Sequence, residues 1–162
     1  MSEVSIRPAG QGDAETISRL VISTLRESNA RDYSEAVIAR VGQGFRPEAV
    51  RAFIDRRRVF VAVIGHEVVG TASLDGHVVR TVFVKPAFQG RGIGRALMDE
   101  IGRTAIRNGI TTLAVPSSVT AEPFYASLGF RAVRDAWRGD ERTIVMERIL
   151  RERRLPGRDP DR

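Results

Sequence analysis

A strand, a glycine-rich loop and the start of a helix follow one another in Val82-Phe83-Val84-Lys85-Pro86-Ala87-Phe88-Gln89-Gly90-Arg91-Gly92-Ile93-Gly94-Arg95-Ala96-Leu97. The first residues are mostly β-branched or aromatic, which favours a strand, and Pro86 ends it. Three alternate glycines then lead into a helix predicted from about 92 to 108. Glycines let a ligand approach the backbone closely, and the first turn of a helix has unpaired N–H donors. The stretch therefore predicts an anion site suited to a pyrophosphate.

Two known phosphate-binding patterns do not fit this loop. The P-loop ends in Gly-Lys followed by Ser or Thr, whereas this loop ends in Gly94-Arg95-Ala96. The dinucleotide fingerprint spaces its glycines by two and then three, in a parallel βαβ unit. Here Gly90, Gly92 and Gly94 are each two residues apart, and the loop follows predicted antiparallel hairpins. Both patterns are therefore set aside.

The chain before the loop predicts helices followed by an antiparallel meander. A strand at 4–7 precedes a helix that Asp13 is expected to cap. Asp32 and Glu35 are spaced as a capping box for a second helix, and Pro47 suits the first turn of a third. Strands joined by short turns are then expected at 59–64, 68–74 and 78–84.

The chain after the glycine-rich loop continues the same sheet. We expect a strand at 111–115 that Pro116 ends, a short helix at about 120–128, and strands at 130–137 and 143–150. The fold class is therefore α/β (α+β): one domain, residues 1–150, with a mixed, mostly antiparallel central sheet flanked by helices. Residues 151–162 are expected to form a basic, flexible C-terminal tail, because they lack an apolar period.

Composition limits the possible chemistry. The 162 residues include no cysteine, which excludes disulfides, thiolate metal sites and cysteine nucleophiles. The two histidines, His66 and His77, do not have metal-ligand spacing, so no metal is expected. The N-terminus does not resemble a signal peptide, and the longest plain apolar run, Val59 to Ile64, is too short to cross a bilayer. We therefore expect a cytoplasmic protein without a membrane partner.

The net charge is +6 and Lys85 is the only lysine, so the basic residues are almost all arginine. This charge is consistent with an ordinary solvated surface. It is also consistent with attraction of an anion such as a phosphorylated cofactor, RNA or an acidic protein. No RNA-binding motif or helix-turn-helix pattern is present, so a nucleic-acid partner is disfavoured while remaining open.

Three segments resemble the GCN5-related N-acetyltransferase (GNAT) superfamily. Its acetyl-CoA signature is Gln or Arg, two residues, Gly, one residue, and Gly or Ala, which Gln89, Gly92 and Gly94 fill. The lead-in Val84-Lys85-Pro86 is also similar. The segment 121–130, with Phe124-Tyr125 and Gly129-Phe130, resembles the family's Phe-Tyr-x-x-x-Gly-Phe motif, and 6–14 resembles its N-terminal strand and first helix. The resemblance spans about residues 4 to 150 in order.

This resemblance implies an acetyl-CoA-dependent N-acetyltransferase. Tyr125 would be the catalytic residue, a proton donor to the leaving thiolate. The backbone of Val82 and Val84 would hold the pantetheine arm, as an added strand pairs with an open edge. Ser118 would contact the cofactor, although it could equally cap the next helix. The implied cofactor-binding residues are Val82, Val84, Gln89, Gly90, Arg91, Gly92, Ile93, Gly94, Arg95 and Ser118.

The general base and the acceptor stay open at this point. The strand 77–84 lacks the glutamate that some relatives carry, which leaves His77, Asp75, Glu67 or a water chain as the base. In the family, the acceptor site is usually built by segments that correspond here to 26–53 and 134–142. Three aromatic residues there belong either to that site or to the core: Tyr33, Phe45 and Trp137.

The function expected from the resemblance is direct transfer of an acetyl group from acetyl-CoA to a primary amine of a small molecule or protein, in a ternary complex. One alternative is a non-catalytic module that binds acetyl-CoA as a sensor. Another is an acetyltransferase directed at RNA or tRNA. A homodimer is left open.

Overall fold

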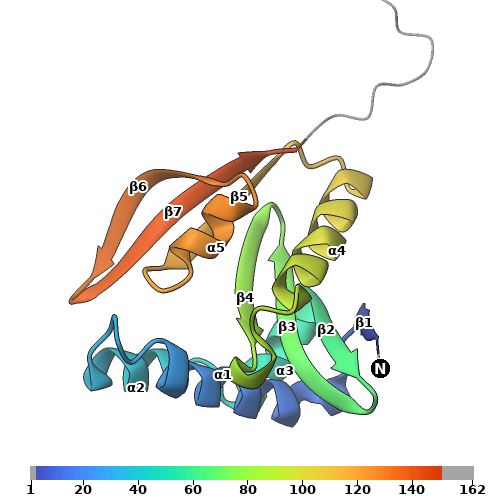
Figure 1. The fold of residues 1–162 in the computed structure, drawn as a ribbon, viewed down its shortest axis with the longest axis horizontal. Coiled ribbons are helices and arrows are strands. Elements are labelled where there is room, and N and C mark those ends of the chain that lie inside the picture. Colours follow the sequence, from blue (N-terminus) through green and yellow to red (C-terminus); the bar gives the residue numbers. More distant parts are fainter. Residues whose placement is uncertain (1–2, 151–162) are drawn as a thin grey trace, which may run out of the picture.

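The computed structural model describes residues 3–150 and arranges them as a seven-stranded sheet with helices on both faces (Figure 1). The strands are β1 (Val4–Pro8), β2 (Arg58–Ile64), β3 (Glu67–Asp75), β4 (Val78–Val84), β5 (Thr112–Ser118), β6 (Arg131–Arg138) and β7 (Glu141–Ile149). The helices are α1 (Ala14–Ser28), α2 (Glu35–Gln43), α3 (Pro47–Arg56), α4 (Ile93–Arg107) and α5 (Glu122–Ser127). Short 3-10 turns occur at Gln11–Asp13 and Pro86–Phe88.

The strand order is β1-β2-β3-β4-β5-β7-β6, and β4 with β5 is the one parallel pair. This confirms the expected mixed, mostly antiparallel sheet and the antiparallel meander of β2, β3 and β4. The basic segment 151–162 lies outside the described residues. Between residues 3 and 150, no helix is both long and apolar enough to span a membrane.

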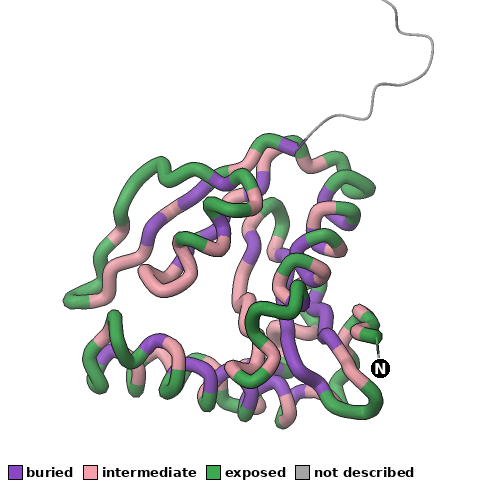
Figure 2. Tube along the Cα trace, in the orientation of Figure 1, coloured by how far each residue is buried: buried purple, intermediate pink, exposed green. Residues whose placement is uncertain are grey.

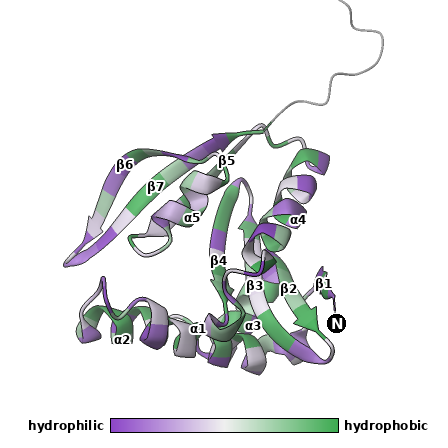
Figure 3. Ribbon diagram, in the orientation of Figure 1, coloured by the Kyte–Doolittle hydropathy of each residue, from purple (hydrophilic) through white to green (hydrophobic). Residues whose placement is uncertain are grey.

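Two hydrophobic clusters cover the two faces of the sheet. Strand β2 is apolar throughout its centre (Figure 3) because it contributes to both: Phe60 and Ala62 to the cluster beneath α4, Val59 and Val61 to the cluster beneath α1. The buried stripe of α1 is Ile17, Leu20, Val21 and Leu25, and that of α4 is Ile93, Leu97, Met98, Ile101 and Ala105. Both stripes match the periodicity of the sequence. Figure 2 shows β3 largely buried and the edge strand β6 largely exposed.

Strand β4 contains an irregularity that simple alternation does not predict. Its pairing with β3 shifts register near Thr81, which has a φ of +56°. A positive φ is rare for a β-branched residue, and an extra residue in one strand is a β-bulge. Val79 and Val82, three residues apart, consequently pack in the same cluster as α4, whereas Phe83 packs in the cluster of α1. The bulge thus resets which face each side chain occupies.

The sheet opens between β4 and β5. These strands pair at one position, Val78 with Ala114, and then diverge, while β5 stays paired with β7 as far as Ser118. The β6–β7 hairpin follows β5 away from β4, and its tip lies near α2 (Figure 1). A contact of 3.5 Å between Arg40 and Asp140 joins α2 to that tip. The opening exposes backbone on the facing edges of β4 and β5.

The expectation that Pro116 ends the fifth strand is wrong. Pro116 lies within β5, opposite Val145 of β7. On the β7 side, the N–H of Leu150 donates to the carbonyl of Thr111 at 2.8 Å. On the β4 side, the N–H of Ala114 donates to the carbonyl of His77 at 3.0 Å. By alternation, the nitrogen of residue 116 faces β4, where the strands have already separated. The missing N–H of proline therefore removes no ladder bond.

The capping box expected at Asp32 and Glu35 is also wrong. Ser34 caps α2, with its Oγ accepting a hydrogen bond from the N–H of Val37 at 3.2 Å. The carboxylate of Asp32 instead accepts a bond of 2.6 Å from the Thr120 hydroxyl. The polar segment before α2 is thereby attached to the end of β5, which brings it to the opening.

Asp13 stands at the start of α1 without a side-chain capping bond. Its carboxylate accepts hydrogen bonds from the Arg7 guanidinium at 2.9 and 3.0 Å and from the N–H of Gly10 at 2.8 Å. The Arg7 contact is the main cause that lowers the pKa of Asp13. Asp13 therefore fixes the turn between β1 and α1, not the helix start that the sequence predicts.

Candidate functional site

A cavity of about 710 Å³ occupies the opening between β4 and β5. Its volume lies within the range of small-molecule and cofactor sites. Its loop end is lined by Gly90, Gly92, Gly94 and Arg95. Its aromatic end, on the side of α1 and α3, is lined by Tyr33, Phe45, Phe53, Arg57 and Phe83. The cavity therefore runs from one face of the sheet to the other.

The glycines of the loop end have two different roles. Gly90 and Gly92 have φ of +77° and +81° and open space around them, so they supply left-handed backbone that other residues adopt at a cost. Gly94 has no such conformation, but a Cβ there would lie 3.0 Å from Phe124 of α5. The loop therefore requires two glycines for its turn and one for close packing.

Helix α4 begins directly after Gly92, whose carbonyl accepts the N–H of Ala96 at 3.0 Å. The N–H groups of the first helical turn, at Ile93, Gly94 and Arg95, have no partner within the helix and border the cavity. Together with the helix dipole they form an anion site. The sequence-predicted residues of the loop, except Arg91, thus lie together at one end of the cavity.

Two loop side chains differ from the simple expectation of ligand contact. The Gln89 amide donates to the carbonyl of Val84 at 3.0 Å and to the Ser28 hydroxyl at 3.3 Å, so it fixes the loop to β4 and α1. The Arg91 guanidinium lies over the Phe88 ring, 5.2 Å from its centroid, and Arg91 does not line the cavity. Arg95 does line it and supplies the cation of the loop end.

The main chain of β4 faces the cavity at Val82 and Val84, and the carbonyl of Val84 already accepts the Gln89 side-chain amide at 3.0 Å. The N–H of Lys85 donates to the carbonyl of Val69 on β3 at 2.8 Å. By alternation, the N–H and carbonyl of Val84 point away from β3 and towards the opening. Val82, two residues earlier and past the bulge, has the same orientation. An extended ligand could pair with this edge as a short strand does.

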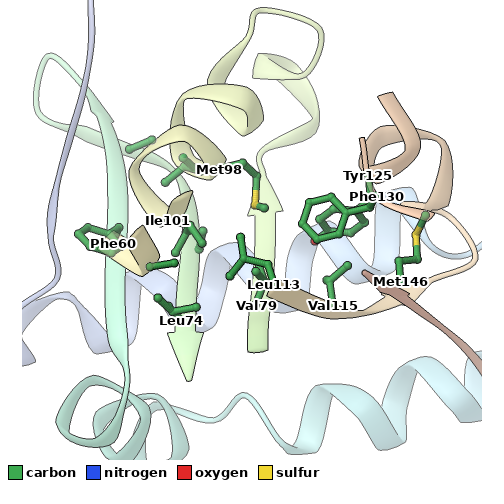
Figure 4. Packing of buried hydrophobic residues seen from close by; sticks show 14 of the residues in the cluster. Phe60, Leu74, Val79, Met98, Ile101, Leu113, Val115, Tyr125, Phe130 and Met146 are labelled. Carbon is green, nitrogen blue, oxygen red and sulfur yellow. The ribbon is translucent and has the colours of Figure 1, made fainter. Parts of the chain in front are cut away.

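Tyr125 of α5 lines the cavity and is 4% exposed. Its ring packs edge-on against Phe130, with centroids 5.6 Å apart (Figure 4). It also packs edge-on against Phe124, with centroids 5.1 Å apart. Burial is the one influence on its hydroxyl, to which no residue among 3–150 contributes a hydrogen bond. Burial raises the pKa of Tyr125, so the hydroxyl stays protonated at neutral pH. It is therefore a proton donor without a protein acceptor.

Ser118 supports the turn before α5 but does not cap that helix, whose N-cap is Ala121. Its Oγ accepts a hydrogen bond of 3.1 Å from the N–H of Ala121, which supports the turn before α5. It also lines the cavity at the end of β5.

The aromatic residues considered for the acceptor site separate into two groups. Tyr33 and Phe45 line the cavity, whereas Trp137 is 65% exposed on β6 and does not. The Tyr33 hydroxyl donates to the carbonyl of Arg142 at 2.7 Å and accepts the N–H of Val119 at 2.7 Å. Tyr33 thus joins the segment before α2 to β7 and to the end of β5.

None of the three side chains considered as the base reaches the cavity. His77 is exposed at the β3–β4 turn, Glu67 is exposed and contacts Lys85 at 3.0 Å, and Asp75 contacts Arg80 at 3.2 Å. Glu141 of β7 is the one carboxylate that lines the cavity among the described residues. Within residues 3–150, no group of three His, Cys, Asp or Glu side chains is placed to hold a metal.

Sequence reasoning missed Arg57, Arg80, Thr81 and Glu141, all of which line the cavity. The sequence did contain a signal for Arg80, because an arginine in the middle of an apolar strand needs a partner or a cavity. Arg57 and Glu141 stand at the boundaries of elements, where an exposed charge is ordinary. Their positions follow from the packing of distant segments.

Comparison with known proteins agrees with this geometry. Residues 29–146 match the family described as an acetyltransferase (GNAT) domain. The uncharacterised N-acetyltransferase YafP of Escherichia coli (strain K12) is 26% identical over 134 residues, which cover 83% of this chain and 85% of YafP.

Solved structures show the same fold. The GCN5-related N-acetyltransferase from Rhodopseudomonas palustris superposes with a TM-score of 0.86 at 24% identity, over 93% of this chain and 98% of that one. The PaiA N-acetyltransferase from Thermoplasma acidophilum, in complex with coenzyme A, superposes with a TM-score of 0.79 at 19% identity, over 91% of this chain and 99% of that one. With the family match over most of its length, the chain belongs to the GNAT family and is an acetyl-transferring enzyme of the N-acetyltransferase class.

Proposed function

We propose that the protein transfers an acetyl group from acetyl-CoA directly to a primary amine, with both substrates bound in one ternary complex. The observation that carries this proposal is the continuous cavity, which joins an anion site at its loop end to an aromatic end on the other face of the sheet. Two substrates can enter it from opposite ends and meet at the bulge of β4. The chain has no cysteine that could hold the acetyl group as a thioester.

The loop end fits the cofactor. The free N–H groups at the start of α4 and the Arg95 side chain suit a pyrophosphate. The edge of β4 at Val82 and Val84 suits the two amides of a pantetheine arm. A structural relative of this fold, PaiA, is in complex with coenzyme A.

The reaction at the junction involves two protons. The nitrogen lone pair of the amine attacks the acetyl carbonyl carbon, and the carbon–sulfur bond then breaks. The sulfur leaves with the electron pair and takes the Tyr125 proton, because a thiolate is more basic than water and the tyrosine is protonated. The nitrogen loses one proton to water, and water returns a proton to Tyr125. The products are the N-acetyl amine and the free thiol of CoA.

The amine must arrive uncharged, since an ammonium group has no lone pair. Among the described residues, no histidine or carboxylate lies at the bulge to remove its proton. The acceptor therefore deprotonates in water, and kcat/KM should rise with pH up to the pKa of the acceptor amine. A plateau near pH 6.5 would instead indicate a protein base such as a histidine.

Calorimetric titration with acetyl-CoA and with CoA tests the cofactor assignment. Saturable binding of both, followed by thiol release in the presence of an amine, is the expected result. Binding without thiol release from any primary amine would favour a non-catalytic sensor. Absence of binding would contradict the proposal.

Tyr125→Phe tests the proton donor. The substitution keeps the aromatic packing and removes the hydroxyl, so turnover should fall by roughly 100-fold while acetyl-CoA affinity stays unchanged. Steady-state kinetics and calorimetry on the same preparation separate the two quantities. Turnover equal to that of the wild type would assign Tyr125 to packing alone.

A further inference from the structure

The aromatic end of the cavity contains a largely buried arginine with weak protein contacts. Arg57 has 15% of its side chain exposed, and its guanidinium carbon lies 3.8 Å from the centroid of the Phe53 ring. Its Nε is 3.8 Å from the Asp75 carboxylate, and its Nη1 is 3.5 Å from the Thr81 hydroxyl. A carboxylate bound to an arginine fork normally lies below 3 Å from its nitrogens. The fork of Arg57 is therefore held in place with donor capacity left over.

The charge at this position is also incompletely balanced. Arg80 lines the same cavity and takes the shorter contact with Asp75, at 3.2 Å. One carboxylate thus serves two guanidinium groups. Burial lowers the pKa of Arg57, and the positive charge of Arg80 lowers it further. An anion bound beside Arg57 would relieve both effects.

The arginine lies next to the reacting position. Thr81, which Arg57 contacts, forms the bulge of β4, and Val82 follows directly. The proposed function has the two substrates meet at this bulge. A group bound to Arg57 would therefore belong to the part of the acceptor close to its nitrogen.

From this arrangement we propose that the acceptor is an amine with a carboxylate near its reacting nitrogen, as in an α-amino acid, and that Arg57 with Arg80 binds this carboxylate. The inference rests on the proposed function and adds the chemical class of the acceptor. Acceptors with a second positive charge at this position, such as linear polyamines, are repelled by the two arginines. The cavity-lining carboxylate, Glu141, belongs to β7 and lies 3.8 Å from Arg40 of α2, so its charge faces a cation of the protein.

The test compares each acceptor with its analogue that lacks the carboxylate, at equal concentrations of uncharged amine, because a carboxamide has an amine of lower pKa than the amino acid. Enzyme saturated with acetyl-CoA is assayed by thiol release with the twenty standard α-amino acids, with their α-carboxamides and with a linear polyamine. At least one amino acid should be acetylated, with a kcat/KM roughly tenfold or more above that of its carboxamide. Arg57→Gln should reduce this ratio towards one without changing acetyl-CoA affinity, because the contacts of Arg57 are with Phe53, Asp75 and Thr81 and none is with the loop end.

Arg58→Gln is the matched control: the neighbouring arginine is exposed and does not line the cavity, so the ratio should stay at the wild-type value. If Arg57→Gln does not fold, Arg80→Gln, at a side chain 40% exposed, should lower the ratio by a smaller factor. Acetylation of carboxamides or the polyamine as fast as of amino acids would overturn the inference. So would turnover of no amino acid by enzyme that binds acetyl-CoA. Failure of the wild-type protein to bind acetyl-CoA would instead contradict the proposed function itself.

Discussion

The two ends of the cavity are built in different ways. The loop end consists of backbone N–H groups, glycines and one arginine, all within residues 82–95. The aromatic end consists of side chains from α3, β4 and the segments around α2, and it depends on bonds such as Tyr33 to Arg142, 109 residues apart. The first is a local structure that recurs wherever its short sequence folds as strand, loop and helix. The second exists only when the whole domain is assembled.

This difference predicts unequal consequences of substitution. Changes at the loop end should remove cofactor affinity with small effects on folding. Changes at the aromatic end should alter stability and acceptor binding together, because the same side chains serve both.

Gly92→Glu should have the largest effect. It places a carboxylate at the anion site, where like-charge repulsion costs several kcal/mol, so acetyl-CoA affinity should fall by about 100-fold or more. The positive φ of Gly92 adds a loss of about 1–2 kcal/mol in the free energy of unfolding. Calorimetry and chemical denaturation measure the two quantities.

Gly65→Glu is the control for that strain, because Gly65 also has a positive φ, +62°, and open surroundings, in the turn between β2 and β3. It should show a similar loss of stability and normal acetyl-CoA affinity. Unchanged affinity in Gly92→Glu would contradict the assignment of the loop end.

Tyr33→Phe should have an intermediate effect at the aromatic end. It leaves the N–H of Val119 and the carbonyl of Arg142 without their partner, which costs roughly 1–3 kcal/mol in the free energy of unfolding. The acceptor KM should rise and acetyl-CoA affinity should stay constant. Trp137→Phe, at an exposed aromatic outside the cavity, should change neither the free energy of unfolding nor the acceptor KM. A loss of acetyl-CoA affinity in Tyr33→Phe would show that the two ends are not independent.

Thr24→Val should have the smallest effect, with the opposite sign. The Thr24 hydroxyl is buried with no partner among residues 3–150, so an isosteric methyl should raise the free energy of unfolding by about 1 kcal/mol. Ser18 on the same helix provides the contrast, since its hydroxyl donates to the carbonyl of Phe45 at 2.5 Å. Ser18→Ala should therefore lower stability by about 1 kcal/mol. A stability loss in Thr24→Val would show that its hydroxyl is paired.

Several features of the fold were predictable from the sequence because they depend on neighbours in the chain. The buried stripes of α1 and α4 follow from helical periodicity, and the meander of β2 to β4 follows from continuous apolar runs separated by turns. The predictions that were wrong concern competition with distant groups. The Asp32 carboxylate accepts a hydrogen bond from Thr120, and Ser34 caps α2 in its place. Pairing with β7 keeps Pro116 within β5, which the proline was expected to end.

The sequence by itself determined the loop end, since glycine spacing, a preceding strand and a following helix suffice to present free N–H groups to an anion. Only the tertiary structure decided the aromatic end. The bulge at Thr81 depends on how β4 packs between two clusters, and the contact of Arg57 with Thr81 spans 24 residues. Such contacts form through space between segments whose own sequences favour no particular partner. The proposed cofactor could therefore be inferred before the fold was known, whereas the proposed acceptor class depends on which side chains the fold brings together.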